Sequence, residues 1–252
     1  MGKNDFPKGL VQPDRGHKFS IDSVFLSCFV NPQKGQKIID LGCGCGVISI
    51  GILLKNQEAK LKIVGIDIDP AMIECAKENA KKFGVEKEFT LILGDVKKIK
   101  QIKEIKSGEF DIGVINPPYR DRQMGRLSFY SGKNRARFEE QATLDDFICA
   151  AHLLIKNRGR VFIVYLTERI VYLFSVLKKY NFEPKRIRFI HGHIHKPSKI
   201  FLLEAIKNGN PSLTVEPPII QYKDSSGENQ YTDDTLKFCP FLIPKYLRLR
   251  ER

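Results

Sequence analysis

Residues 38–46 read Ile38-Ile39-Asp40-Leu41-Gly42-Cys43-Gly44-Cys45-Gly46, which places three glycines directly after a short apolar, β-branched run. The apolar-periodic segment 47–55 follows and predicts a helix. In an open α/β sheet, nucleotide-like ligands bind at such a strand-to-helix turn, because glycine lets the backbone approach the ligand closely. The spacing G-x-G-x-G departs from the G-x-G-x-x-G dinucleotide fingerprint. We therefore predict a cofactor-binding loop that includes Asp40, Gly42, Gly44 and Gly46.

Outward from this loop, short β-branched runs alternate with amphipathic segments. This alternation is typical of a mostly parallel sheet with helices on both faces. It predicts an α/β fold with a seven-stranded, Rossmann-like sheet. The predicted strands are 37–41, 63–67, 89–93, 110–116, 160–165, 186–191 and 200–205. The predicted helices are 21–30, 47–55, 70–83, 144–154 and 168–180, and the turn-rich residues after Ala205 are expected to be loops of the same domain.

Acidic residues stand at the ends of the next two predicted strands. Asp67 ends the second strand, where a carboxylate can accept hydrogen bonds from both ribose hydroxyls of a bound nucleotide. Asp95, followed by Val96, ends the third strand and could accept a hydrogen bond from an adenine amine. Asp69 is expected instead to cap the following helix. NAD and S-adenosylmethionine would both use Asp67, so these residues alone leave the cofactor open.

The fourth predicted strand runs into Asn116-Pro117-Pro118-Tyr119. The two prolines remove two backbone donors and fix φ, so the carbonyls of this turn should project rigidly into the site. The Asn116 side-chain oxygen and the Pro117 carbonyl can accept both N–H bonds of an exocyclic amine and free its lone pair toward an electrophile. Tyr119 would stack on a flipped-out base. We predict that these four residues form the catalytic motif.

These residues together resemble a class I S-adenosylmethionine-dependent methyltransferase of the N-P-P-Y amine-methylating group. The lead-in Gly16–Leu26, the segment Arg135–Glu139 and the segment Leu203–Lys207 are similar to the bacterial tRNA N6-adenine methyltransferases. The resemblance implies that Phe19 and Asp22 help to enclose S-adenosylmethionine. It implies a lead-in of residues 1–36 that closes over the cofactor, and a methyltransferase domain of residues 37–252, within a single domain overall.

Charge points to a polyanionic partner. The 252 residues carry 42 Lys and Arg against 29 Asp and Glu, a net charge of +13, which favours nucleic acid or an acidic surface. Cations crowd the stretch after the N-P-P-Y motif, opposed there by Asp121 and interleaved with aromatic residues. We predict that this stretch contacts tRNA. Its cations are Arg120, Arg122, Arg126, Lys133, Arg135 and Arg137. A second basic stretch, residues 178–199, could equally be a set of solvated faces.

Other features of the sequence set limits. No apolar run approaches the roughly 18 residues of a membrane span, and the N-terminus lacks the apolar core of a secretory signal. The six cysteines show no C-x-x-C pair, so we expect reduced thiols in a cytoplasmic protein without a membrane partner. His191, His193 and His195 alternate, yet no Cys or carboxylate clusters beside them in the sequence, and we expect no metal site.

We therefore predict that the chain transfers a methyl group from S-adenosylmethionine to the N6 amine of an adenine in the anticodon loop of a tRNA. One alternative keeps the cofactor and methylates a glutamine side chain of a translation release factor. The other alternative is a non-catalytic RNA-binding protein with a methyltransferase fold.

Overall fold

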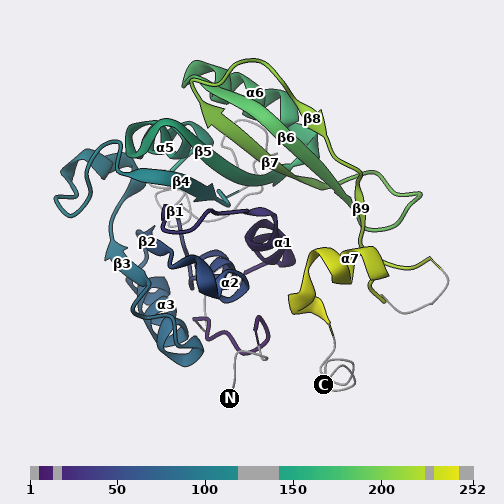
Figure 1. Ribbon diagram of the computed structural model, residues 1–252, viewed down its shortest axis with the longest axis horizontal. Coiled ribbons are helices and arrows are strands. Elements are labelled where there is room, and N and C mark those ends of the chain that lie inside the picture. Colours follow the sequence, from purple (N-terminus) through teal and green to yellow (C-terminus); the bar gives the residue numbers. More distant parts are fainter. Residues whose placement is uncertain (1–5, 14–18, 119–141, 225–229, 244–252) are drawn as a thin grey trace, which may run out of the picture.

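A computed structural model of the chain describes residues 6–13, 19–118, 142–224 and 230–243 (Figure 1). Its centre is one sheet with the strand order β3-β2-β1-β4-β5-β7-β6-β8, in which β9 also pairs with β6. The strands are β1 (Lys37–Leu41), β2 (Lys62–Asp67), β3 (Phe89–Leu93), β4 (Phe110–Ile115), β5 (Ile155–Leu166), β6 (Phe182–His191), β7 (Ile200–Lys207), β8 (Thr214–Val215) and β9 (Ile219–Ile220).

The predicted fold class is confirmed. Strands β3, β2, β1, β4 and β5 are parallel, and β7 pairs antiparallel with both β5 and β6. The predicted count of seven strands is too low, because the sheet has nine strands within the described residues. The two additional strands, β8 and β9, have two residues each and pair in parallel with β6. Two residues are too short to show an alternating pattern, so the sequence carries no signal for them.

Helices cover both faces of the sheet (Figure 1). The α-helices are α1 (Ile21–Phe29), α2 (Val47–Lys55), α3 (Pro70–Phe83), α5 (Leu144–Leu154), α6 (Ile170–Lys179) and α7 (Asp233–Phe238). Short 3-10 helices are η2 (Gln57–Ala59), η3 (Val96–Gln101), η4 (Thr167–Arg169) and η5 (Pro240–Leu242). One apolar cluster joins the sheet to α1, α2 and α3, and a second joins its other face to η3, α5 and α6.

Local sequence explains how the helix beside the predicted site begins and ends. The Asp69 carboxylate accepts a hydrogen bond from the backbone N–H of Ala71 at 2.9 Å, which confirms its predicted role as the cap of α3. Pro70 follows at the first turn, where its missing N–H has no cost. Gly84 ends α3 with a φ of 68°, a left-handed conformation that glycine adopts without strain.

The segment after β7 packs back onto α1 rather than forming loops alone. The rings of Phe25 and Phe238 stack with their centroids 6.3 Å apart. The sulfur atoms of Cys28 and Cys239 are 3.1 Å apart, and all six cysteines of the chain are free thiols. The prediction that residues after Ala205 are loops is therefore wrong for β8, β9 and α7. Among the helices that the structure describes, none is long and apolar enough to cross a bilayer.

Candidate active site

The ends of four parallel strands meet at one edge of the sheet. Leu41 at the end of β1 lies between Ile66 of β2 and Ile115 of β4, and Asp67 pairs with Leu93 of β3. The glycine loop, Asp67, Asp95 and Asn116 therefore follow strands that stop level with one another. The chain moves from β1 outward to β3 and then returns to place β4 on the other side of β1. This reversal of strand order is the position at which open α/β sheets bind ligands.

The glycine loop closes tightly over the end of β2. The N–H groups of Gly42 and Cys43 both donate to the carbonyl of Ile66, at 2.8 and 2.9 Å, and the N–H of Gly46 donates to the Cys43 carbonyl. Gly42, Gly44 and Gly46 all have positive φ, which explains why this turn needs glycine. These N–H groups of the loop are thus hydrogen-bonded within the protein. A ligand would therefore pack against the glycine backbone rather than accept a series of hydrogen bonds from it.

Asp67 ties the loop to the end of β2. Its Oδ2 atom accepts the N–H of Gly44 at 2.8 Å, and its Oδ1 atom accepts the N–H of Asp69 at 2.9 Å. Burial raises the pKa of Asp67 above its usual value, while these backbone hydrogen bonds oppose the shift. Each carboxylate oxygen has two lone pairs, so the bonds within the protein leave acceptor capacity for ribose hydroxyls.

Asp40 is a fully buried carboxyl on the α2 face of β1. Its Oδ2 atom accepts a 2.6 Å hydrogen bond from the hydroxyl of Ser49, in the first turn of α2. Among the described residues, no group donates a hydrogen bond to its Oδ1 atom. Burial raises the pKa of Asp40 to about 7, and the nearby charge of Asp67 adds to the shift. A buried carboxyl oxygen without a donor is an acceptor position beside the loop.

These residues fit the predicted S-adenosylmethionine. A Cβ atom added at Gly44 would meet no heavy atom within 4 Å, so open space lies against the middle of the loop. The carboxylate of Asp67 borders the loop and complements a cofactor that carries positive charge on its sulfonium and its amino group. Open space, acceptors and negative charge therefore coincide at one place.

The other residues predicted to bind the cofactor are described by their positions and contacts within the protein. The Asp95 carboxylate accepts the N–H of Lys97 at 2.9 Å and so caps η3. Val96 begins η3 and is buried against the apolar cluster beneath α5. Phe19 packs on the cluster around α1, and Asp22 lies in the first turn of α1. Their contacts with cofactor stay predictions.

Asn116 follows β4 directly and is held by the helix of the lead-in. Its amide nitrogen donates to the hydroxyl oxygen of Ser23 at 2.8 Å. Pro117 is buried and Pro118 is exposed, so the chain reaches the protein surface at the second proline. Tyr119 and the cations predicted to contact RNA, Arg120, Arg122, Arg126, Lys133, Arg135 and Arg137, lie outside the described residues.

The second basic stretch contributes mainly to internal contacts. Arg186 of β6 donates to Glu204 at 2.8 Å and to Glu216 at 3.0 Å, and its guanidinium lies 4.1 Å from the ring centroid of Phe29. Arg188 donates to the Pro217 carbonyl at 3.0 Å. Sequence proximity could not show these partners, because Glu204 and Glu216 come from other segments of the chain. The structural interpretation is therefore the better one for both arginines.

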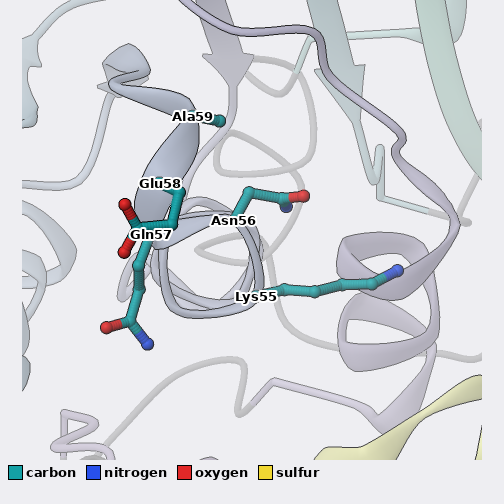
Figure 2. A pocket seen from close by; sticks show the side chains of 5 residues that line it. All are labelled: Lys55, Asn56, Gln57, Glu58 and Ala59. Atoms are coloured by element: carbon teal, nitrogen blue, oxygen red, sulfur yellow. The ribbon is translucent and has the colours of Figure 1, made fainter.

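A surface hollow at the other end of α2 is separate from this site. Figure 2 shows its lining residues, which are Lys55, Asn56, Gln57, Glu58 and Ala59. Lys55 extends away from the other four, and its ammonium donates to the Cys28 carbonyl. Since α2 begins at the glycine loop and ends here, the hollow lies by the amino ends of the parallel strands, away from the ligand-binding edge.

Two polar residues of the site were not assigned from the sequence. Ser23 contacts Asn116, and Ser49 contacts Asp40. The available signal is a serine inside an otherwise apolar, buried helix, since a buried hydroxyl requires a partner. The identity of that partner depends on packing between distant segments and is not written in the local pattern.

Comparison with known proteins places this geometry in a family. The family model described as a methyltransferase domain matches residues 32–170. A tRNA1(Val) (adenine(37)-N6)-methyltransferase of Porphyromonas gingivalis is 28% identical in an alignment of 237 residues that covers 91% of this chain and 86% of that protein. A putative protein N5-glutamine methyltransferase of Methanocaldococcus jannaschii is 35% identical over 98 residues, 39% of this chain and 44% of that protein.

A solved structure supports the fold. The crystal structure of a predicted O-methyltransferase from Agrobacterium tumefaciens matches with a TM-score of 0.70 and 17% identity, over 87% of this chain and 96% of that one. The predictions of a methyltransferase enzyme and of S-adenosylmethionine as its methyl donor are confirmed by the family match, which covers more than half of the sequence and includes the glycine loop, Asp67 and Asn116. The chain belongs to the methyltransferase domain family.

Proposed function

We propose that this methyltransferase transfers a methyl group from S-adenosylmethionine to the N6 amine of an adenine in the anticodon loop of a tRNA. The observation that carries the proposal is the share of the chain that aligns with each relative. The relative named as a tRNA adenine-N6-methyltransferase aligns with 91% of the chain, whereas the relative named as a glutamine methyltransferase aligns with 39%. A shared substrate is better supported by similarity that extends beyond the cofactor-binding half.

Residues at the ends of β1 and β2 would hold the cofactor. Asp67 would accept hydrogen bonds from the ribose hydroxyls. The open space at Gly44 would let the cofactor approach the protein backbone closely. Asp40 would contribute the acceptor Oδ1 beneath the loop. When bound, S-adenosylmethionine supplies a methyl group made electrophilic by its sulfonium.

Residues after β4 would hold the amine. The Asn116 amide oxygen and the Pro117 carbonyl accept the two N–H bonds of the amine, which turns its lone pair toward the methyl carbon. An amine becomes strongly acidic only as it acquires positive charge, so no carboxylate base is required before attack. The rate then comes from alignment and from acceptors aimed at the charge that grows in the transition state.

The net charge of +13 supports a polyanionic substrate. An unpaired loop base can be turned into a site at a lower cost than a paired one. The basic stretch that follows the N-P-P-Y motif would grip the phosphates around that base. The cytoplasmic location expected from the sequence stays a prediction.

Glutamine methylation is the second candidate, because a glutamine amide presents the same two hydrogens to Asn116 and Pro117. It is favoured by the M. jannaschii relative, whose identity over the shared segment is 35%. This shorter similarity is expected for any two enzymes that share the cofactor site and the amine-binding turn.

Parallel incubations separate the candidates. The protein and S-adenosylmethionine labelled in its methyl group are incubated with total tRNA and, separately, with a translation release factor. Asn116→Ala serves as the control for label that arises from a contaminating enzyme. We expect label in tRNA with the wild type and little with the variant. Label in the release factor alone would support the second candidate, and label in neither would support the non-catalytic alternative.

A further inference from the structure

Ser23 and Asn116 are 93 residues apart in the sequence and in direct contact in the fold. Ser23 lies in the first turn of α1 and is 4% exposed. Asn116 is the first residue after β4. The 2.8 Å hydrogen bond from the Asn116 amide nitrogen to the Ser23 hydroxyl oxygen therefore links the lead-in helix to the turn that carries the proposed chemistry.

The direction of this hydrogen bond fixes how the amide is turned. A side-chain amide has donors on its nitrogen and acceptors on its oxygen, and the two ends face different directions. Because the nitrogen meets the Ser23 hydroxyl, the oxygen points in a different direction from that hydroxyl. For an amine substrate this orientation is the useful one, since an amine offers N–H donors and requires the oxygen of Asn116 rather than its nitrogen.

A neighbouring serine shows that the contact is not forced by helix chemistry. Ser27 lies one turn further along α1, is also buried, and donates to the carbonyl of Val24 at 2.7 Å. A buried serine of this helix can thus satisfy its hydroxyl within the helix. Ser23 instead receives the amide of a residue on the sheet.

We infer that Ser23 is a positioning residue for methyl transfer: by accepting the amide nitrogen of Asn116, it holds the amide oxygen toward the substrate amine. The inference rests on the proposed role of Asn116. Ser23 makes no contact with the reacting atoms in this account and acts through Asn116 alone. Without the hydroxyl, the amide nitrogen would lose this hydrogen bond, and the oxygen would be held less firmly in the productive orientation.

Kinetics of single and double variants test this dependence. We expect Ser23→Ala to lower kcat on tRNA about tenfold and to change the affinity for S-adenosylhomocysteine, measured by calorimetry, less than twofold. Ser23→Thr retains the hydroxyl oxygen and should restore kcat to within about threefold of wild type. Ser27→Ala removes another buried hydroxyl from the same helix and should leave kcat within twofold.

The double variant supplies the decisive comparison. If Ser23 acts through Asn116, then adding Ser23→Ala to Asn116→Ala should lower kcat by less than twofold further. An equal loss in both backgrounds, or wild-type kcat in Ser23→Ala, would overturn the inference. Thermal melting of each variant shows whether a loss of kcat comes from a loss of folded protein, and the Ser23→Thr variant remains informative if Ser23→Ala does not fold.

A spectroscopic measurement separates this inference from the proposed substrate. The side-chain amide signal of Asn116, assigned by its absence in Asn116→Ala, should shift in Ser23→Ala and stay in place in Ser27→Ala. An unmoved signal in Ser23→Ala would contradict the contact itself. If wild-type protein labels a release factor instead of tRNA, the tRNA proposal fails, and the same variants compared on that glutamine substrate still confirm or overturn the positioning role.

Discussion

Oδ2 of Asp67 accepts the backbone N–H of Gly44 at 2.8 Å, across 23 residues of sequence. The acid that ends β2 thus shapes the middle of the glycine loop, in addition to its proposed role in holding the cofactor ribose. Its other oxygen accepts the N–H of Asp69, at the start of α3. A change at Asp67 should therefore disturb both the proposed ribose contacts and the shape of the glycine loop.

We expect Asp67→Ala to weaken cofactor binding by about 1.5–3 kcal/mol for each charge-assisted hydrogen bond lost, less whatever an entering water restores. Calorimetry with S-adenosylhomocysteine measures the change. Asp69→Ala is the matched control, because it removes a neighbouring carboxylate that caps α3. It should cost about 1 kcal/mol of folding stability and leave the affinity unchanged. Unchanged affinity in Asp67→Ala would remove this residue from the cofactor site.

The buried carboxyl of Asp40 should make folding stability depend on pH. Its folded-state pKa of about 7 lies above the ordinary value of 3.8, so the folded protein retains a proton that the unfolded chain releases between these pH values. Stability should therefore fall as pH rises from about 4 to about 7. The difference between wild type and Asp40→Asn should change by roughly 4 kcal/mol at most over that range. Urea unfolding at several pH values measures it, and parallel curves for the two proteins would show that Asp40 stays charged in the fold.

Arg186 should contribute to stability rather than to RNA binding. Its guanidinium joins Glu204 and Glu216 and lies over Phe29, and its side chain is 25% exposed. We expect Arg186→Met to lower the free energy of unfolding by about 2 kcal/mol, less than the loss for a fully buried pair. Lys178→Met, in the same basic stretch, should leave stability unchanged. A stable Arg186→Met protein with a reduced salt dependence of tRNA binding would place this arginine on the RNA instead.

The basic stretch after Tyr119 should determine how tRNA affinity depends on salt. Affinity should fall steeply with salt concentration, with a log–log slope set by the number of phosphates neutralised. Replacing Arg135 and Arg137 by alanine should make that slope shallower. Filter binding at several salt concentrations gives the slope. An unaltered slope in the double variant would assign the phosphate contacts to another surface.

The central strands could be predicted from sequence, and the irregular ones only in part. Strands β1 and β3 have the predicted bounds, because each is a short apolar run between polar or glycine residues. Strand β5 begins at Ile155, five residues before the predicted start. Its exposed residues 156–158 include Arg158, which has a φ of 64°. Strand β6 continues through Pro184, where its register shifts. Polar or proline-containing strand ends lack the alternation on which prediction depends.

The site shows the same division. Asp67 and Asn116 could be placed at one sheet edge because parallel strands end together, and the strand registers confirm that placement. Asp95 caps η3 in the structure, whereas the sequence predicted a contact with adenine. The sequence could not distinguish these roles, because an aspartate after a strand can serve as a helix cap or as a ligand contact. The contact between Ser23 and Asn116 could not be predicted, because it depends on how α1 packs against the end of β4.

Mass spectrometry of nucleosides from tRNA incubated with the protein and methyl-labelled cofactor tests the proposed activity most directly. The account predicts label in N6-methyladenosine from the anticodon loop, with turnover lower by roughly 10²–10³ in Asn116→Ala, as for the loss of one preorganised group that stabilises the transition state. Cofactor affinity should fall much less in that variant. Label in a different nucleoside, or tRNA without label while a release-factor glutamine is methylated, would contradict it.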